Sequence, residues 1–194
     1  FDLVGPMSNR LAMTSEVIQV LVEILNEFRD ELGRSVVRFT NFKVLDAIIG
    51  RISESFDVQK KIRSVLAQFW RKHSPKETEK LLLSIEGVTS KALESVKMEM
   101  LLHISKDLTC PAMDTLTKIE GLYPRDKVIQ ETLRETKQFL HYAELFRIVS
   151  HLRFDITLIY NYEYYYDIMF QGFLLSGDVI AAGGCYDSVV EHFA

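Results

Sequence analysis

Residues 154–182 are rich in aromatic and branched side chains and read FDITLIYNYEYYYDIMFQGFLLSGDVIAA. Such side chains favour the half-buried surface of a β-sheet. We predict antiparallel strands joined by tight turns at Asn161 and at Ser-Gly-Asp 176–178. The strands are expected over residues 154–160, 164–175 and 179–182. The C-terminal part of the chain is therefore predicted to be a sheet.

The residues after this stretch complete the predicted C-terminal unit. Gly183 and Gly184 permit a close backbone approach, since glycine has no Cβ atom. A short helix is predicted over residues 186–193. This unit begins near His151, where the composition changes.

The first fifty residues alternate between strand and helix patterns. Residues 1–5 alternate like a strand but begin with neither a Met nor a cap, so we expect the chain to start inside a larger element. Apolar residues then recur at helical spacing over residues 15–32, with Thr14 as the N-cap and Gly33 as the stop. Residues 36–40 predict a strand, and a second helix is expected to follow. Asn41 is its predicted cap, and it carries Val44, Leu45, Ile48 and Ile49.

Residues 56–146 show almost no strand signal and are predicted to be helical. Ser74-Pro75 begins a helix that Gly87 is expected to end, and Thr89 caps a helix running through Ile104. Helix breaks are expected at Cys110-Pro111 and at Pro124. The sequence thus predicts a helical lobe between two sheet-forming parts, with divisions at 1–55, 56–150 and 151–194.

Composition limits the class of protein. The 194 residues carry a net charge of -4, which disfavours a wholly basic nucleic-acid coat but not a local basic patch. The two cysteines lack metal-ligand spacing and favour a reducing compartment. No apolar run approaches the roughly 20 residues that span a bilayer. We expect a cytoplasmic protein with no membrane association, no metal, because the five histidines are scattered, and no cofactor.

Several segments, in order, resemble the histidyl-tRNA synthetase family. Residues 1–5 and the helix after them are similar to the end of its motif 2. NFKVLDAI, residues 41–48, resembles its N-H-x-x-L-L-D-A-I helix with Phe42 replacing the histidine. Residues 160–170 resemble R-G-L-D-Y-Y-T-G-x-x-F, and residues 182–187 resemble G-G-G-R-Y-D. The resemblance implies an α+β fold, namely a partial class II antiparallel sheet with flanking helices and an all-helical insertion lobe.

Three departures from these motifs imply that no catalytic residues remain. Tyr160 stands where the family has the arginine beside the activated phosphate, and a phenol carries no such charge. A cation on developing phosphate charge commonly supplies a few kcal/mol of barrier reduction. Asp167 replaces the motif's glycine and brings negative charge towards the phosphates, and Cys185 replaces a second arginine.

The tyrosines of the same motif leave two interpretations open. Tyr164 and Tyr165 match the histidine-recognising tyrosines of the family, so that, with Glu163, they would form a vestigial histidine pocket. Alternatively, the aromatic residues between 160 and 166 simply pack across a sheet. Packing is the more common role of such residues in strands.

The degenerate pattern is most similar to the regulatory domain of the general-control kinases, which respond to amino-acid starvation and phosphorylate the alpha subunit of translation initiation factor 2. This resemblance implies uncharged tRNA as a partner, a kinase domain in the same polypeptide and a homodimer. These residues contain neither a Gly-rich phosphate loop nor H-R-D or D-F-G motifs, so the segment is not itself the kinase.

The start of the helical lobe is the candidate tRNA-binding surface, because RNA binding depends on phosphate contacts from Lys and Arg. Its basic residues outnumber Asp57, Glu77 and Glu79. They are Lys60, Lys61, Arg63, Arg71, Lys72, Lys76 and Lys80. The alternative is an ordinary solvated helix face.

Three other functions fit the same resemblance. The chain could be a fragment of an active histidyl-tRNA synthetase that uses ATP and magnesium. It could be the synthetase-like regulatory subunit of ATP phosphoribosyltransferase, although the roughly ninety-residue helical lobe disfavours that assignment. It could also be only a dimerisation module.

Overall fold

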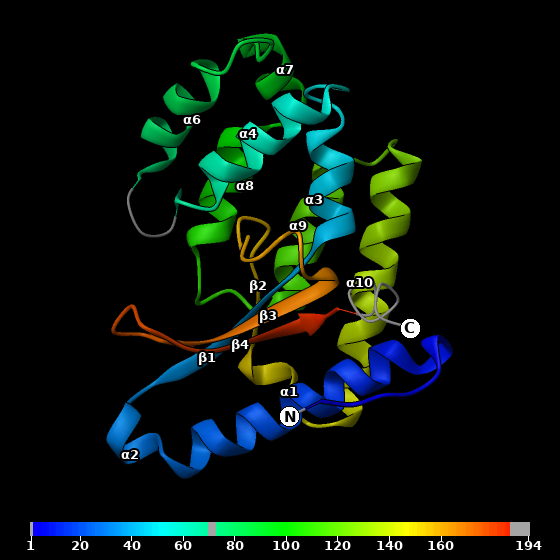
Figure 1. The fold of residues 1–194 in the computed structure, drawn as a ribbon, viewed down its shortest axis with the longest axis vertical. Helices are drawn as coiled ribbons and strands as arrows, with labels where there is room; N and C mark the ends of the chain where they lie inside the picture. The colour runs from blue at the N-terminus through cyan, green and yellow to red at the C-terminus, as the bar shows by residue number, and fades with distance from the viewer. Residues whose placement is uncertain (1, 70–72, 187–194) are drawn as a thin grey trace.

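The computed structural model describes residues 2–69 and 73–186, which form a four-stranded sheet with helices around it (Figure 1). The strand order is β2-β1-β3-β4. The strands are β1 (Ser35–Asn41), β2 (Leu152–Phe154), β3 (Tyr166–Leu174) and β4 (Val179–Cys185). β1 pairs in parallel with β2 and antiparallel with β3, and β3 pairs antiparallel with β4. The predicted α+β fold is confirmed, and the sheet is mixed rather than wholly antiparallel.

The two central strands are buried along nearly their whole length, including polar residues such as Arg38 of β1 and Gln171 of β3. The predicted hairpin of β3 and β4 is confirmed, and Gly177 in its turn has a φ of 110°, a conformation that glycine adopts readily. β4 is a half-exposed edge strand. Of the predicted helix over residues 186–193, only Tyr186 lies within the described residues.

The N-terminal helix begins earlier than its apolar pattern indicates. α1 covers Arg10–Glu27, follows the 3₁₀ helix η1 (Met7–Asn9) and leads into α2 (Arg29–Leu32), which ends at Gly33 as expected. Thr14 is not the cap, because its hydroxyl donates to the Arg10 carbonyl one turn back inside the helix. The strand predicted over residues 1–5 is wrong for residues 2–5, which have no regular structure, and Phe1 lies outside the described residues.

The turn from β1 into α3 (Phe42–Ile49) follows the sequence prediction. The Asn41 side chain accepts a hydrogen bond from the Lys43 backbone N–H at 3.0 Å and so caps α3. Its amide also donates to the Thr136 hydroxyl at 3.0 Å. One asparagine thus joins the sheet, α3 and a helix nearly a hundred residues later.

The described part of residues 56–146 is helical, as predicted. The helices after α3 are α4 (Phe56–Leu66), α6 (Pro75–Leu83), α7 (Ser90–Ser95), α8 (Met98–Lys106), α9 (Ala112–Leu122) and α10 (Lys127–Leu145), followed by the 3₁₀ helix η2 (Val149–His151). Ser74 and Glu77 form a capping box at the start of α6, and Thr89 caps α7. Two details differ from prediction. α6 ends at Leu83 rather than Gly87, and Lys97, with a φ of 50°, interrupts the helix expected to run through Ile104.

The helices occupy two regions of the molecule (Figure 1). α4, α6, α7 and α8 lie together beyond one end of the sheet, whereas α10 packs against α1 and α3, and α9 packs against β2. One continuous set of buried apolar residues joins both regions. The divisions at residues 55 and 150 stay predictions. None of the described helices is both long enough and apolar enough to span a bilayer.

The strand predicted over residues 154–160 is wrong beyond Phe154, and Asp155 explains why. Its carboxylate accepts hydrogen bonds from the backbone and hydroxyl of Thr157, and it forms a buried ion pair with Arg38. A local side-chain bond of this kind competes with strand pairing. The chain therefore leaves the sheet after residue 154 and returns only at Tyr166. Of the tyrosines at positions 160, 162, 164, 165 and 166, only Tyr166 lies in a strand.

Candidate functional site

Four charged side chains from four elements meet where β3 begins. Asp167 accepts a hydrogen bond from Arg10 Nε of α1 at 2.7 Å, and its second oxygen lies 3.5 Å from Lys43 Nζ of α3. Glu135 of α10 forms ion pairs with both Arg10 and Lys43. The two cations are thus opposed by two carboxylates, and the cluster offers little net charge to an incoming phosphate.

Asp167 has an unusual backbone conformation. Its φ is 61°, in the left-handed region that favours glycine, and it lies at an irregularity in the pairing of β3 with β4. Its side chain is only 1% exposed, and its Oδ1 has no hydrogen-bond donor among the described residues. A backbone suited to glycine therefore carries a buried carboxylate here, at the position where the resemblance places a glycine.

The loop between β2 and β3 is anchored by Tyr162. Its hydroxyl donates to Asp46 Oδ2 at 2.8 Å, and its ring packs edge-on against Phe42 at 5.0 Å between centroids. The guanidinium of Arg63 lies 4.3 Å from the centre of the same ring and also bonds Asp46. Burial, with the hydrogen bond to Asp46, raises the pKa of Tyr162 to about 12. Tyr162 is therefore a neutral structural contact between the loop, α3 and α4.

The two tyrosines of the predicted histidine pocket contact each other. The rings of Tyr164 and Tyr165 meet edge to face at 5.0 Å, and Tyr164 also stacks on Tyr186 at 5.7 Å. Burial raises the pKa of Tyr165, whose ring packs over Gly184 so closely that an added Cβ would lie 2.9 Å from it. Glu163 pairs with Lys60 Nζ of α4 at 3.0 Å. The assignment of a vestigial pocket stays a prediction.

The other two replaced motif residues are Tyr160 and Cys185. Tyr160 is half-exposed in the loop, and its phenol adds no positive charge there. Cys185, at the end of β4, lies 3.7 Å from the Thr14 hydroxyl of α1. It forms no disulfide with Cys110. No group of three or more His, Cys, Asp or Glu within residues 2–69 and 73–186 is arranged to hold a metal ion.

The predicted tRNA-binding cations divide into three groups. Lys60, Lys61, Lys76 and Lys80 are exposed on α4 and α6. Arg63 is buried and committed to Asp46, so it is a wall residue rather than an available phosphate ligand. Two further candidates, Arg71 and Lys72, lie outside the described residues.

A hollow of about 550 Å³ opens between α4 and residues 159–164. It brings Lys60 of the predicted tRNA-binding surface next to Glu163 and Tyr164 of the predicted pocket. Sequence patterns did not predict that these residues lie together or that Phe56 lines the hollow. They also did not predict the contact between Arg10 and Asp167. Arg10 and Asp167 are 157 positions apart, and no local pattern signals such a pair.

Comparison with known proteins identifies the family. The family model described as histidyl-tRNA synthetase matches residues 4–194. The chain is 22% identical, over 98% of its length, to a Dictyostelium discoideum protein named probable serine/threonine-protein kinase ifkB, covering 15% of that protein. It is 23% identical over 99% of its length to eIF-2-alpha kinase GCN2 of Arabidopsis thaliana, covering 16% of it. It is 24% identical over its full length to the cytoplasmic histidine–tRNA ligase of D. discoideum, covering 39% of it.

Solved structures agree on the fold. Histidyl-tRNA synthetase from Nostoc sp. PCC 7120 superposes with a TM-score of 0.78 at 18% identity, over 94% of this chain and 42% of the other. An ATP phosphoribosyltransferase regulatory subunit/histidyl-tRNA synthetase from Bacillus halodurans C gives 0.75 at 17% identity, over 94% and 44%. The chain thus spans less than half the length of each of these five proteins. From the matched residues and the shared fold, this chain belongs to the histidyl-tRNA synthetase family.

Proposed function

We propose that this chain is a synthetase-like regulatory segment that forms no aminoacyl-adenylate, binds uncharged tRNA and controls a Ser/Thr kinase acting on translation initiation factor 2. The buried carboxylate of Asp167 carries the proposal. It takes up Arg10 and Lys43, the two cations at the start of β3, in internal ion pairs. Because Tyr160 supplies no replacement charge, developing negative charge on a phosphate would meet a carboxylate rather than an uncommitted guanidinium.

The loss of catalysis is tested by histidine-dependent exchange of pyrophosphate into ATP, with magnesium. The purified chain is expected to give no exchange above a no-enzyme blank, because removing one such electrostatic contact commonly costs 10²- to 10³-fold in rate. An intact histidyl-tRNA synthetase, assayed in parallel, serves as the positive control. Exchange that depends on histidine would overturn this part of the proposal.

The link to a kinase is supported by the relatives. Two of them are named as kinases, and the chain matches only 15% and 16% of their lengths, as expected for one segment of a multidomain polypeptide. We place the kinase domain in the same polypeptide and the protein in the cytoplasm. In the full-length protein, deacylated tRNA should raise phosphorylation of the initiation factor, and deletion of residues 4–194 should abolish that response. A tRNA response that survives the deletion would contradict the assignment.

Uncharged tRNA is the proposed ligand of the exposed lysines on α4 and α6. Phosphate contacts of this kind weaken as salt rises, because binding releases condensed counterions. Lys60→Glu with Lys61→Glu should weaken binding of deacylated tRNA about tenfold at 100 mM salt and flatten the salt dependence by one to two units of slope. Arg63 is left unchanged in this test because its charge holds Asp46 and the Tyr162 ring.

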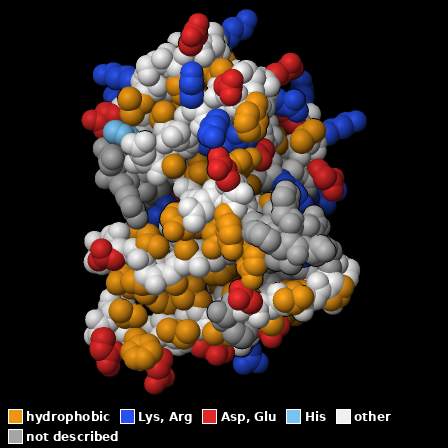
Figure 2. All heavy atoms as spheres, viewed as in Figure 1, with side chains coloured by type: hydrophobic (Ala, Val, Ile, Leu, Met, Phe, Trp, Pro, Cys, Tyr) orange, Lys and Arg blue, Asp and Glu red, His pale blue; other side chains and the backbone are white. Residues whose placement is uncertain are grey.

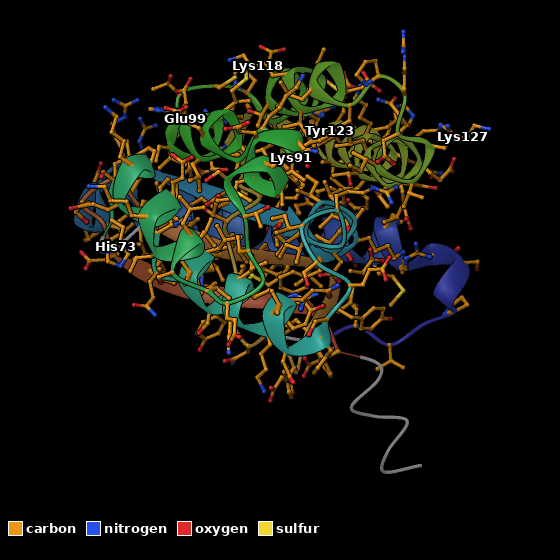
Figure 3. The ribbon with its side chains drawn as sticks, turned by 90° about the horizontal axis from the view of Figure 1, so that it is seen from above. His73, Lys91, Glu99, Lys118, Tyr123 and Lys127 are labelled. Carbon is orange, nitrogen blue, oxygen red and sulfur yellow. The ribbon has the colours of Figure 1, made fainter. Side chains whose placement is uncertain are left out.

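A matched reversal controls for net charge. Arg125→Glu with Lys127→Glu also reverses two exposed cations, just before α10 and at its first residue, and Figure 3 shows Lys127 at the outer edge of the molecule. This variant should leave the tRNA affinity within about twofold. Equal losses from both sites would indicate a non-specific charge effect and remove α4 as the binding surface, while no loss from either would argue against it as well.

The proposed homodimer is supported by an apolar surface. Figure 2 shows hydrophobic side chains gathered over the lower half of this face, whereas charged side chains dominate the helical upper half. Exposed apolar residues include Ile24 of α1, Phe28 between α1 and α2, and Leu175 and Ile180 of the β3–β4 hairpin. Ile180→Lys should shift the sedimentation of the chain from dimer to monomer. Unchanged sedimentation as a monomer in both forms would refute the dimer.

A further inference from the structure

The hollow between α4 and residues 159–164 combines three properties that the function above does not use. Its volume of about 550 Å³ lies within the roughly 300–1,000 Å³ of small-ligand pockets. Ala67 and Ile159 contribute an apolar lining, while Lys60 and Glu163 lie at its charged side. It therefore accepts a ligand that is flat and apolar at one end and charged at the other.

Two aromatic residues line this hollow. Phe56, the first residue of α4, is 71% exposed, which is an unfavourable setting for so large an apolar ring. Tyr164 is half-exposed and is held in place by stacking on Tyr186. Proteins that bind single-stranded RNA stack bases on such rings. A nucleobase would use the exposed rings, and the side-chain amide of Asn161 offers both a donor and an acceptor to a base edge.

The charges favour an anionic ligand. Lys60 and Glu163 pair at 3.0 Å, but their side chains are 66% and 82% exposed. A solvent-exposed pair of this kind is weak, so an incoming phosphate can take Glu163's place beside Lys60. Arg63 stays in the wall against Tyr162 and keeps the hollow in shape.

We propose that this hollow binds one unpaired nucleobase against Phe56 and Tyr164, with the attached phosphate on Lys60. The ligand is an unpaired base of RNA or a free nucleotide, which share this chemistry. The proposal rests on the RNA binding proposed above and deepens it. It assigns the hollow to a single-stranded part of the tRNA. The other exposed lysines, such as Lys61 and Lys76, would bind phosphates elsewhere on the tRNA.

The test measures binding of a fluorescein-labelled rA₆ hexanucleotide, of AMP and of deacylated tRNA to the intact chain. Phe56→Ala should weaken rA₆ binding roughly tenfold and leave its salt dependence unchanged, because stacking releases no counterions. Lys60→Gln should weaken binding and lower the salt slope by about 0.7, the value for one phosphate of a single strand. Glu163→Gln should tighten binding, because it frees Lys60.

Leu145→Ala is the matched control, since Leu145 is a similarly exposed apolar residue at the end of α10. It should leave every affinity within twofold. AMP binding that is lost in Phe56→Ala would assign the site to a free nucleotide. Unchanged rA₆ and AMP affinities in Phe56→Ala would overturn the proposal.

The outcomes separate this proposal from the broader one. If deacylated tRNA binds but Phe56→Ala changes nothing, the hollow is not the base site and tRNA binding by the lysines stands. If deacylated tRNA does not bind at all, the proposed regulatory function fails, and the AMP measurement alone decides whether the hollow takes a nucleobase.

Discussion

Replacing Asp167 tests the charge cluster and the backbone strain together. Asp167→Ala removes the hydrogen bond from Arg10 Nε at 2.7 Å and the ion pair with Lys43 at 3.5 Å. A hydrogen bond to a charged group contributes about 1.5–3 kcal/mol. Part of that loss is offset because the variant no longer buries Asp167 Oδ1, which lies 3.5 Å from Lys43 Nζ but accepts no hydrogen bond from the residues that the structure describes. We expect a net loss of about 1–2 kcal/mol in the free energy of unfolding.

The comparison with Asp167→Gly isolates the backbone contribution. Both variants lose the carboxylate, but only glycine adopts a φ of 61° without steric cost. In a left-handed conformation alanine is disfavoured by about 1 kcal/mol, the reverse of its usual advantage over glycine. Asp167→Gly should therefore be more stable than Asp167→Ala by about 1 kcal/mol, or about 2–4 °C in Tm for a chain of this size.

The assay is urea and thermal denaturation of the wild type and both variants, with and without pyrophosphate at matched ionic strength. Without Asp167, Arg10 and Lys43 face only Glu135 and should bind an anion. At tenfold excess over its Kd, pyrophosphate would then add about 1.4 kcal/mol of stability to the variants. Glu99→Ala, which removes an exposed carboxylate of α8 away from this cluster, is the control. Equal stability of the alanine and glycine variants, or equal stabilisation of the wild type by pyrophosphate, would refute this reasoning.

Two further predictions concern stability, and a third concerns the titration of a tyrosine. Gly183→Ala should cost about 2 kcal/mol or more in urea denaturation, because its Cβ would lie 2.5 Å from the Phe170 ring; a neutral result would show that the ring moves freely. The hydrogen bond from Arg51 lowers the pKa of Asp126, which also caps α10, so its contribution is present above pH 4 and lost as pH falls through that lowered pKa. Asp126→Ala should remove about 1 kcal/mol at pH 7 and flatten the stability profile below pH 4. Burial raises the pKa of Tyr162 to about 12 and raises that of Tyr123 further, so Tyr162→Phe should remove one of the late steps from the ultraviolet titration of the tyrosines; loss of an early step instead would contradict its burial.

Local signals in the sequence predicted much of the secondary structure. Asn41 and Thr89 cap the helices they were expected to cap, and α6 begins at Ser74-Pro75 as expected, because a cap bonds backbone N–H groups only two or three residues away. The hairpin of β3 and β4 followed from the turn at Gly177 and the strands on either side. The family motifs also predicted the fold, which the comparison with the histidyl-tRNA synthetase model bears out.

Two of the wrong predictions lie where charged side chains pair with residues distant in the chain. Residues 154–160 carry strand-favouring side chains, yet the buried pair of Asp155 with Arg38, 117 positions away, turns the chain out of the sheet. Strand propensity is weak compared with such a contact. Likewise, the helix pattern did not reveal that α1 starts at Arg10, a residue engaged by Asp167.

Local patterns in the sequence indicated most helices and strands, the family that the motifs resemble and the motif residues that are replaced. The ion pairs of Asp167 with Arg10 and Lys43, and the hollow between Phe56 and the loop before β3, became evident only in the folded chain. Caps and turns act over a few residues and leave a local pattern. Ion pairs and pockets join positions that are distant in the chain, so their partners become evident only once the chain is folded.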